Sequence, residues 1–372
     1  MNGNKGLSAL PVDCRLTRFF SNLPPIELAF RQGYCGQSEF TAGKVSMDSG
    51  LPFDDFRQLL ARLPGPDEAA RRRVAGTNAA LAKRAGSLGR LEEIAEWLAA
   101  WSGRYPPAVT RPLVAIFAGN HGVARHFVLE KSLEGTAGRV EMTAAGGAAI
   151  NQLCAANDLG LQVFDLALDL PTGDISAEAA LDERGCAATM AFGMEAVAGG
   201  TDLLCIGDLG AGNGLVAAAL SAALFGGAAA DWLGPEPGGE APGLVDKALA
   251  LHGGHFRDPL EALRRAGGRE FAAICGAILA ARMQKIPVIL DGFATTAAAA
   301  VLFRMNGRAL DHCLPGHLSA EPGHARLAQL MGMKPLLDLG LAHGEGTGAA
   351  LAAGIVRNAA LLHSGMAATL KG

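Results

Sequence analysis

The sequence predicts an α/β fold, in which a parallel sheet is flanked by helices and a smaller helical element is attached. Short apolar runs alternate with helical stretches through the middle of the chain. Such alternation is typical of parallel strands joined by right-handed crossovers. The composition agrees, because the 372 residues include 50 glycines and only 5% aromatic residues. Small side chains let helices lie close to a sheet.

Five apolar runs are the expected strands, and each is short enough to be a buried strand of a parallel sheet. They span residues 113–117, 161–165, 203–206, 288–290 and 335–339. The first, third and fourth of these runs end at polar or Gly-containing turns. Ligands of open α/β sheets bind beyond the carboxyl ends of the strands, so we expect these turns to converge on one site.

The chain before the sheet divides into two parts. Residues 1–46 show no sustained period, and we expect a disordered N-terminal extension. Residues 47–105 are expected to form two or three amphipathic helices of a small domain, because apolar residues recur there at intervals of three and four. Residues 106–372 are expected to form the α/β domain, with a C-terminal helix that returns to the small domain.

Charge and cysteine content exclude several classes of protein. The formal net charge is −4, and no Lys/Arg cluster stands out beyond residues 71–73, which argues against nucleic-acid binding. The seven cysteines are scattered and odd in number, as expected of a reducing, cytoplasmic setting. The sequence shows no membrane-spanning or secretion segment.

Residues 207–214, GDLGAGNG, follow an expected strand and precede an Ala-rich run over 215–225. Free backbone N–H groups at such a helix start can bind a phosphate. The spacing is not GxGxxG, and no acidic residue follows at a later strand end to hold a ribose diol, so a dinucleotide is not favoured. A purely structural glycine turn is the alternative interpretation.

Glu345 lies between two glycines in HGEGTG, residues 343–348, before an Ala-rich run that is expected to be helical. A carboxylate flanked by glycines can approach a ligand closely, and partial burial makes a carboxylate a stronger base. A glutamate that caps the following helix would show the same pattern. The pattern alone leaves both interpretations open.

Three further segments also have competing interpretations. Asp291 either binds a ribose hydroxyl or caps the Ala-rich helix that follows it. Lys247 either pairs with a phosphate or is a solvated helix residue. The His- and Glu-containing residues 317–324, with Asp-His-Cys at 311–313, suggest zinc but match no metal-binding template. No metal site is therefore expected.

Six motifs together resemble the nicotinate-nucleotide:dimethylbenzimidazole phosphoribosyltransferase family. They are FAGNHGV at 117–123, GGAAIN at 146–151, GDLGAGN at 207–213, LDGF at 290–293, HLSAEPG at 317–323 and GEGTGA at 344–349. Their order and spacing match from about residue 47 to the end of the chain.

This resemblance implies a Rossmann-like sheet with a smaller helical domain, a homodimer, and no metal or redox cofactor. It implies transfer of the phosphoribosyl group of nicotinate mononucleotide to 5,6-dimethylbenzimidazole or a related base. The products would be nicotinate and α-ribazole phosphate, for assembly of the cobalamin nucleotide loop. Glu345 matches the catalytic carboxylate, which would remove the proton of the base. The implied substrate-binding positions are Asn120, His121, Asp208, Gly210, Gly212, Asn213, Gly214, Lys247, Asp291, Gly292, Ser319, Gly344 and Gly346.

Several site positions depart from the family's pattern. Asp208 replaces a glutamate, and Gly214 and Leu215 replace two threonines, which is expected to weaken substrate positioning. Ala342 and His343 replace an arginine and a leucine. The general base is therefore expected to lack a charged partner.

Residues 124–140 depart from the family as well. When this segment is aligned with the family's pattern by counting back from Gly146 without a gap, Leu129 and Gly138 fall at two positions where the family has polar residues of the base pocket. Three hypotheses follow: the chain keeps the standard reaction, it uses another acceptor such as a purine or a phenolic ring, or it is a weak or inactive paralogue that binds the nucleotide or base as a partner subunit.

Overall fold

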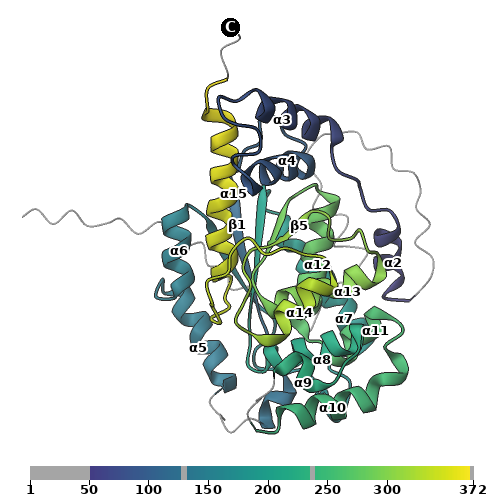
Figure 1. The fold of residues 1–372 in the computed structure, drawn as a ribbon. Helices are drawn as coiled ribbons and strands as arrows, with labels where there is room; N and C mark the ends of the chain where they lie inside the picture. Colours follow the sequence, from purple (N-terminus) through teal and green to yellow (C-terminus); the bar gives the residue numbers. More distant parts are fainter. Residues whose placement is uncertain (1–50, 127–131, 235–238, 369–372) are drawn as a thin grey trace, which may run out of the picture.

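The computed structural model describes residues 51–126, 132–234 and 239–368. Within these ranges a five-stranded parallel sheet is flanked by helices, which confirms the α/β class (Figure 1). The expected disorder of residues 1–46 and the position of Leu129 lie outside the described residues.

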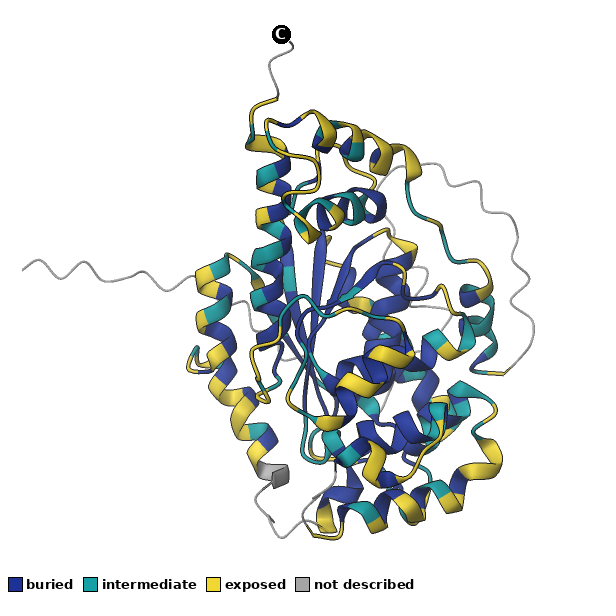
Figure 2. Ribbon diagram, viewed as in Figure 1, coloured by how far each residue is buried: buried dark blue, intermediate teal, exposed yellow. Residues whose placement is uncertain are grey.

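The sheet has the strand order β2-β1-β3-β4-β5, and every neighbouring pair is parallel. Its strands are β1 (Pro112–Ala118), β2 (Gly160–Asp165), β3 (Leu203–Leu209), β4 (Val288–Leu290) and β5 (Cys313–Pro315). Every residue of β3 and β4 is buried, as Figure 2 shows for the central sheet. Burial on both faces explains why these strands are continuous apolar runs rather than alternating ones.

One expected strand is wrong. Residues 335–339 form no strand, and the fifth strand is instead Cys313–Pro315. A single bridge joins Leu337 to His317, just beyond β5. The ladder cannot extend, because proline at 335 has no N–H to donate and the N–H of Leu339 donates to the His317 imidazole at 2.9 Å.

In the described residues before the sheet there are three helices, namely α2 (Asp54–Ala61), α3 (Glu68–Ala80) and α4 (Arg90–Ser102). The C-terminal helix α15 (Thr347–Gly365) starts at the sheet and packs on α3 and α4 (Figure 1). An antiparallel bridge between Leu81 and Ala368 extends this contact beyond the helix end. The C-terminal helix thus packs against α3 and α4, whereas α2 packs into the core on the other face of the sheet.

The remaining helices cover both faces of the sheet. They are α5 (Ser132–Ala144), α6 (Ala149–Asn157), α7 (Glu183–Gly193), α8 (Asn213–Phe225), α9 (Ala229–Leu233), α10 (Ala241–His252), α11 (Pro259–Ala266), α12 (Arg269–Met283), α13 (Phe293–Met305) and α14 (Pro322–Leu330). The side chains of β1 alternate between two cores, one shared with α4, α6 and α15 and the other with α7, α8, α12 and α13. No described helix is both long and apolar enough to cross a membrane.

Candidate active site

A cavity of about 160 Å³ lies at the carboxyl ends of β3 and β4. Its walls are the turn after β3, the turn after β4, the segment after β5, the loop before α15 and one residue of α5. The expected positions that line it are Asp208, Gly210, Asn213, Asp291, Gly292, Ser319 and Gly344. The expected positions thus come from four separate segments of the chain and meet at one edge of the sheet.

The turn after β3 is shaped by close backbone contacts. A Cβ atom on Gly210 would lie 2.4 Å from the carbonyl oxygen of Gly119, so a larger residue does not fit there. Gly212 has φ of +89° and is the N-cap of α8, which is a conformation that favours glycine. Gly212 and Gly214 belong to this turn without being lining residues. The close contact at Gly210 and the positive φ of Gly212 thus give these two glycines a structural role. The turn that they form also borders the cavity.

Asp208 is a buried carboxyl group in the cavity wall. The side-chain amide of Asn213 donates a hydrogen bond to it. Burial raises the pKa of Asp208 well above its ordinary value, and the nearby carboxylates of Asp291, Glu321 and Glu270 raise it further. Several acidic groups thus face a small cavity, which favours occupation by a cationic ligand.

Asp291 caps a helix, but not the expected one. Its carboxylate accepts hydrogen bonds from the backbone N–H groups of Gly346 at 3.1 Å and Ala349 at 2.9 Å. These groups belong to the start of α15, so the expected cap of α13 is wrong. At α13 the hydroxyl of Thr295 accepts from the Gly292 N–H. Burial raises the pKa of Asp291, against the lowering effect of these backbone bonds. Asp291 therefore fixes the Glu345 loop to the end of β4.

Ser319 belongs to a hydrogen-bonded group that continues away from the cavity. Its hydroxyl lies 3.0 Å from the Glu321 carboxylate and 2.9 Å from Nδ1 of His324, and its N–H donates to the same Nδ1. Nε2 of His324 faces the Thr296 hydroxyl at 3.1 Å. Burial lowers the pKa of His324 to about 4, so the ring is neutral at neutral pH. This neutral ring fixes the position of Ser319.

Glu321 lines the cavity, although the sequence suggested it only as part of a zinc site and not as a substrate-binding residue. Burial raises its pKa, and the hydrogen bond from Ser319 lowers it. It lies inside the HLSAEPG motif, two residues from Ser319, so the signal that could have identified it was present. Its carboxylate adds to the acidic lining made by Asp208 and Asp291.

Glu345 does not cap the following helix, so that interpretation is wrong. The residue is buried, with 3% of its surface exposed, and its backbone φ of +60° lies in the left-handed region. The Glu345 N–H donates to the carbonyl oxygen of Asp208 at 3.2 Å. The loop before α15 is therefore tied to the end of β3.

The expected loss of a charged partner for Glu345 is also wrong. Arg139 of α5 reaches the carboxylate, with Nε 2.6 Å and Nη2 2.5 Å from Oε1. His343 lies on the other side, with Nε2 3.4 Å from Oε2. Arg139 and His343 line the cavity, and Glu345 is not among the lining residues. An arginine of α5 thus takes the place of the arginine that is missing from the loop at position 342.

Besides Gly212, Gly214 and Gly346, three further expected positions do not line the cavity. Asn120 is buried and donates to the carbonyl oxygen of Leu168 at 3.0 Å. The imidazole of His121 pairs with the carboxylate of Glu270, and both side chains are fully buried. Lys247 is exposed on α10, which agrees with the alternative interpretation that it is a solvated helix residue. The substrate roles of these three residues remain predictions without support from the cavity.

Residues 311–324 do not form a metal centre in the described part of the chain, where no group of three or more His, Cys, Asp or Glu side chains could hold an ion. Each histidine has a separate structural partner. His312 lies 3.1 Å from the carbonyl oxygen of Ile278, and His317 accepts from the Leu339 N–H. The zinc interpretation is not supported by this arrangement.

Replacing Asp208 by asparagine is expected to stabilise the fold at neutral pH. The pKa of Asp208 is raised in the folded chain, so its contribution to stability is present below its ordinary value of 3.8 and is lost as the pH rises through the raised value. At neutral pH the buried carboxyl is therefore destabilising, and Asp208→Asn should raise Tm by a few degrees. Thermal unfolding between about pH 4 and pH 8 checks this. A variant less stable than wild type at neutral pH would contradict it.

Comparisons with known proteins agree on one family. Residues 63–371 match a family model described as "Phosphoribosyltransferase". The nicotinate-nucleotide–dimethylbenzimidazole phosphoribosyltransferase of Brucella anthropi is 63% identical over 325 residues, which cover 86% of this chain and 96% of that protein. The protein of the same name from Rhizobium meliloti is 64% identical over the same shares. The crystal structure of such an enzyme from Thermus thermophilus has a TM-score of 0.76 at 36% identity, covering 81% of this chain and 97% of that one.

Proposed function

This chain belongs to the phosphoribosyltransferase family that these relatives represent, and we propose on that basis the reaction that their names describe. It transfers the phosphoribosyl group of nicotinate mononucleotide to dimethylbenzimidazole or a related base and releases nicotinate. It is thus a pentosyltransferase of cobalamin nucleotide-loop assembly.

The acidic cavity beside the Glu345 loop is the observation that carries this proposal. Asp208, Asp291 and Glu321 line it; Asp208 and Asp291 are buried and Glu321 is partly buried. Nicotinate mononucleotide carries a cationic pyridinium ring, and a transition state resembling an oxocarbenium ion carries positive charge on the ribose. Carboxylates already held in place stabilise such a charge without reorganising during the reaction.

Glu345 is the proposed general base. As the acceptor's ring nitrogen bonds to the anomeric carbon, the proton on its other nitrogen must leave, and a carboxylate can accept it. The backbone of the Glu345 loop is held by Asp208 and Asp291, and its side chain is held by Arg139. The base is therefore fixed in place before substrate binds.

The turn at residues 210–214 is the proposed phosphate site. It contains the N-terminus of α8, where backbone N–H groups are not used within the helix. The hydroxyl of Thr136 on α5 accepts the N–H of Ala211 at 3.2 Å, which ties this turn to the helix that carries Arg139. This site does not depend on Lys247, which is exposed on α10.

Release of nicotinate from nicotinate mononucleotide tests the function directly. Purified chain is mixed with the nucleotide and dimethylbenzimidazole, and nicotinate and the ribosylated base are quantified by chromatography. We expect both products in equal amounts. Tight binding of the nucleotide by calorimetry without turnover would instead support the inactive-paralogue hypothesis. Turnover with a purine or phenolic acceptor alone would change the acceptor but keep the reaction type.

Two domains are proposed, with residues 47–105 as the small helical domain and 106–372 as the α/β domain. The packing of α15 against α3 and α4 supports the return of the C-terminal helix to the small domain. A cytoplasmic location is also proposed. It is supported by the five cysteines in the described residues, all of which are free and buried.

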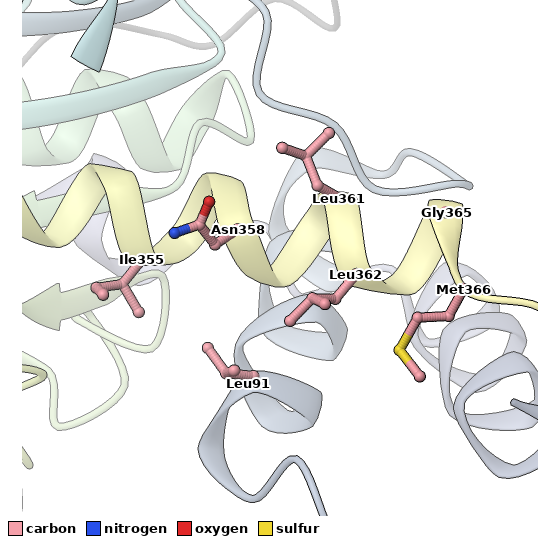
Figure 3. A pocket seen from close by; sticks show the side chains of 7 residues that line it. All are labelled: Leu91, Ile355, Asn358, Leu361, Leu362, Gly365 and Met366. Carbon is pink, nitrogen blue, oxygen red and sulfur yellow. The ribbon is translucent and has the colours of Figure 1, made fainter. Parts of the chain in front are cut away.

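A homodimer is proposed, with an apolar groove between α4 and α15 as its contact surface. The groove is lined by Leu91, Ile355, Asn358, Leu361, Leu362, Gly365 and Met366, and its volume is about 570 Å³ (Figure 3). Leu361 is 62% exposed. An exposed apolar groove is a common feature of protein interfaces.

Replacing Leu361 by glutamate is expected to convert the dimer to a monomer, because a charge cannot be buried in an apolar contact without a partner. Sedimentation velocity at micromolar concentration measures the change. Leu251→Glu is the matched control, since Leu251 is 50% exposed on α10, at the opposite end of the molecule (Figure 1). A Leu361→Glu protein that remains dimeric would place the interface elsewhere.

A further inference from the structure

The proposed reaction releases one proton in each turnover. When the bond between the anomeric carbon and nicotinate breaks, its electron pair neutralises the pyridinium nitrogen. A lone pair of the acceptor base forms the new bond, and the proton on the other ring nitrogen is lost. Without that loss the product would be a cation. The proton must therefore pass from the active site to water before the next cycle.

Glu345 has almost no direct contact with water through which to release that proton. Its side chain is 4% exposed, whereas the side chains of Arg139 and His343, which flank it, are 44% and 52% exposed. Oε1 is held by two nitrogens of Arg139, and Oε2 faces Nε2 of His343 at 3.4 Å. Each oxygen of the carboxylate thus has a different neighbour.

The two flanking groups differ in what they can do with a proton. A guanidinium does not release its proton under conditions an enzyme tolerates, so Arg139 can hold Glu345 but cannot carry a proton from it. An imidazole accepts a proton on one nitrogen and releases another from the second nitrogen near neutral pH. His343 touches Oε2, lines the cavity and is half exposed.

We propose that His343 relays the proton from Glu345 to water and that Arg139 positions the carboxylate for this transfer. The acceptor base gives its proton to Oε2, Oε2 passes it to Nε2 of His343, and the imidazole releases a proton from Nδ1 to solvent. Proton exchange of the half-exposed ring with water then restores the starting tautomer before the next turnover. Arg139 keeps Oε1 occupied, which directs the proton to Oε2. The inference rests on the proposed reaction and adds a role for two residues that flank its base.

Other charged groups face this relay from several elements. Arg139 projects from α5, Asp208 ends β3 and Asp291 follows β4, while Glu321 and His317 lie on the segment after β5. Each of these groups can contribute to the pH profile of kcat. The pH dependence therefore reports on His343 only when wild type and a His343 variant are compared under identical conditions.

The test uses His343→Leu in the full-length chain at low buffer concentration. We expect kcat to fall about tenfold, while KM for nicotinate mononucleotide changes less than about twofold, because the relay acts after binding. Added imidazole should restore kcat in the variant and leave wild type unchanged. His255→Leu, which changes an exposed histidine outside the cavity, should behave as wild type.

Arg139→Lys and Arg139→Met test the positioning role. The lysine variant keeps one positive charge near Oε1 and should recover part of the kcat that the methionine variant loses, with KM for the nucleotide little changed in both. The two variants should also differ in the pH profile of kcat. Equal losses in both, with unchanged pH profiles, would overturn the positioning role.

Three outcomes of the His343 experiment are decisive. A tenfold loss restored by imidazole supports the relay. A loss that imidazole does not restore, or a variant with the kcat and pH profile of wild type, overturns it. Failure of the proposed function is seen separately, because the wild-type chain would then release no nicotinate at any imidazole concentration.

Discussion

Replacing Glu345 by glutamine is expected to lower kcat by about two to four orders of magnitude, which is the range for loss of a general base. The amide keeps the shape of the side chain but cannot accept the proton of the acceptor base. Binding of nicotinate mononucleotide should change less than about threefold, because the amide occupies the same space as the carboxyl group. Steady-state rates of nicotinate release and calorimetric titration with the nucleotide measure the two effects.

The stability of this variant separates chemistry from folding. Arg139 is partly exposed and can return to water when its partner loses charge, so Tm should fall only slightly. Glu195→Gln, at an exposed position on the turn after α7, is the matched control and should keep full activity. Wild-type rates in Glu345→Gln would show that another group accepts the proton.

Much of the sheet could be predicted from the sequence, because buried parallel strands are short apolar runs. The expected runs at 113–117, 161–165, 203–206 and 288–290 all lie within strands. The fifth strand was missed because Cys313–Pro315 contains a single large aliphatic residue and ends in proline. The run at 335–339 is apolar enough for a strand, but its ladder is stopped by a proline at one end and by the His317 side chain at the other. The strand propensity of these residues cannot predict that competing hydrogen bond.

Only the site residues that lie at the carboxyl ends of strands could be predicted from the sequence. Asp208 and Asp291 were expected there because carboxyl ends of parallel strands meet at one edge. Arg139 contacts a carboxylate 206 residues away in the chain, and no local pattern contains such a pair. Asp291 likewise caps a helix that starts more than fifty residues later. Such partners are set by how helices pack on the sheet, which the sequence pattern does not specify.

The packing of α7 against α12 leads to the largest expected effect on stability. A Cβ atom on Gly276 of α12 would lie 1.8 Å from the carbonyl oxygen of Met190 on α7. Gly276→Ala should therefore push the two helices apart, and their contact includes many fully buried side chains. We expect the free energy of unfolding to fall by about 3 kcal/mol and Tm to fall by at least about 5 °C. Thermal unfolding followed by circular dichroism measures the change.

Gly243→Ala provides the matched control, because Gly243 lies exposed in the first turn of α10 with no atom within 4 Å of an added Cβ. This substitution should be neutral or stabilise by up to about 1 kcal/mol, since alanine favours helix more than glycine does. Gly193→Ala tests the same contact from the other helix, where a Cβ would lie 1.9 Å from the carbonyl oxygen of Ala273. If helix separation is the cause, the double variant Gly193→Ala with Gly276→Ala should lose less than the sum of the single losses, because one displacement relieves both clashes. Additive losses would instead indicate two independent local distortions.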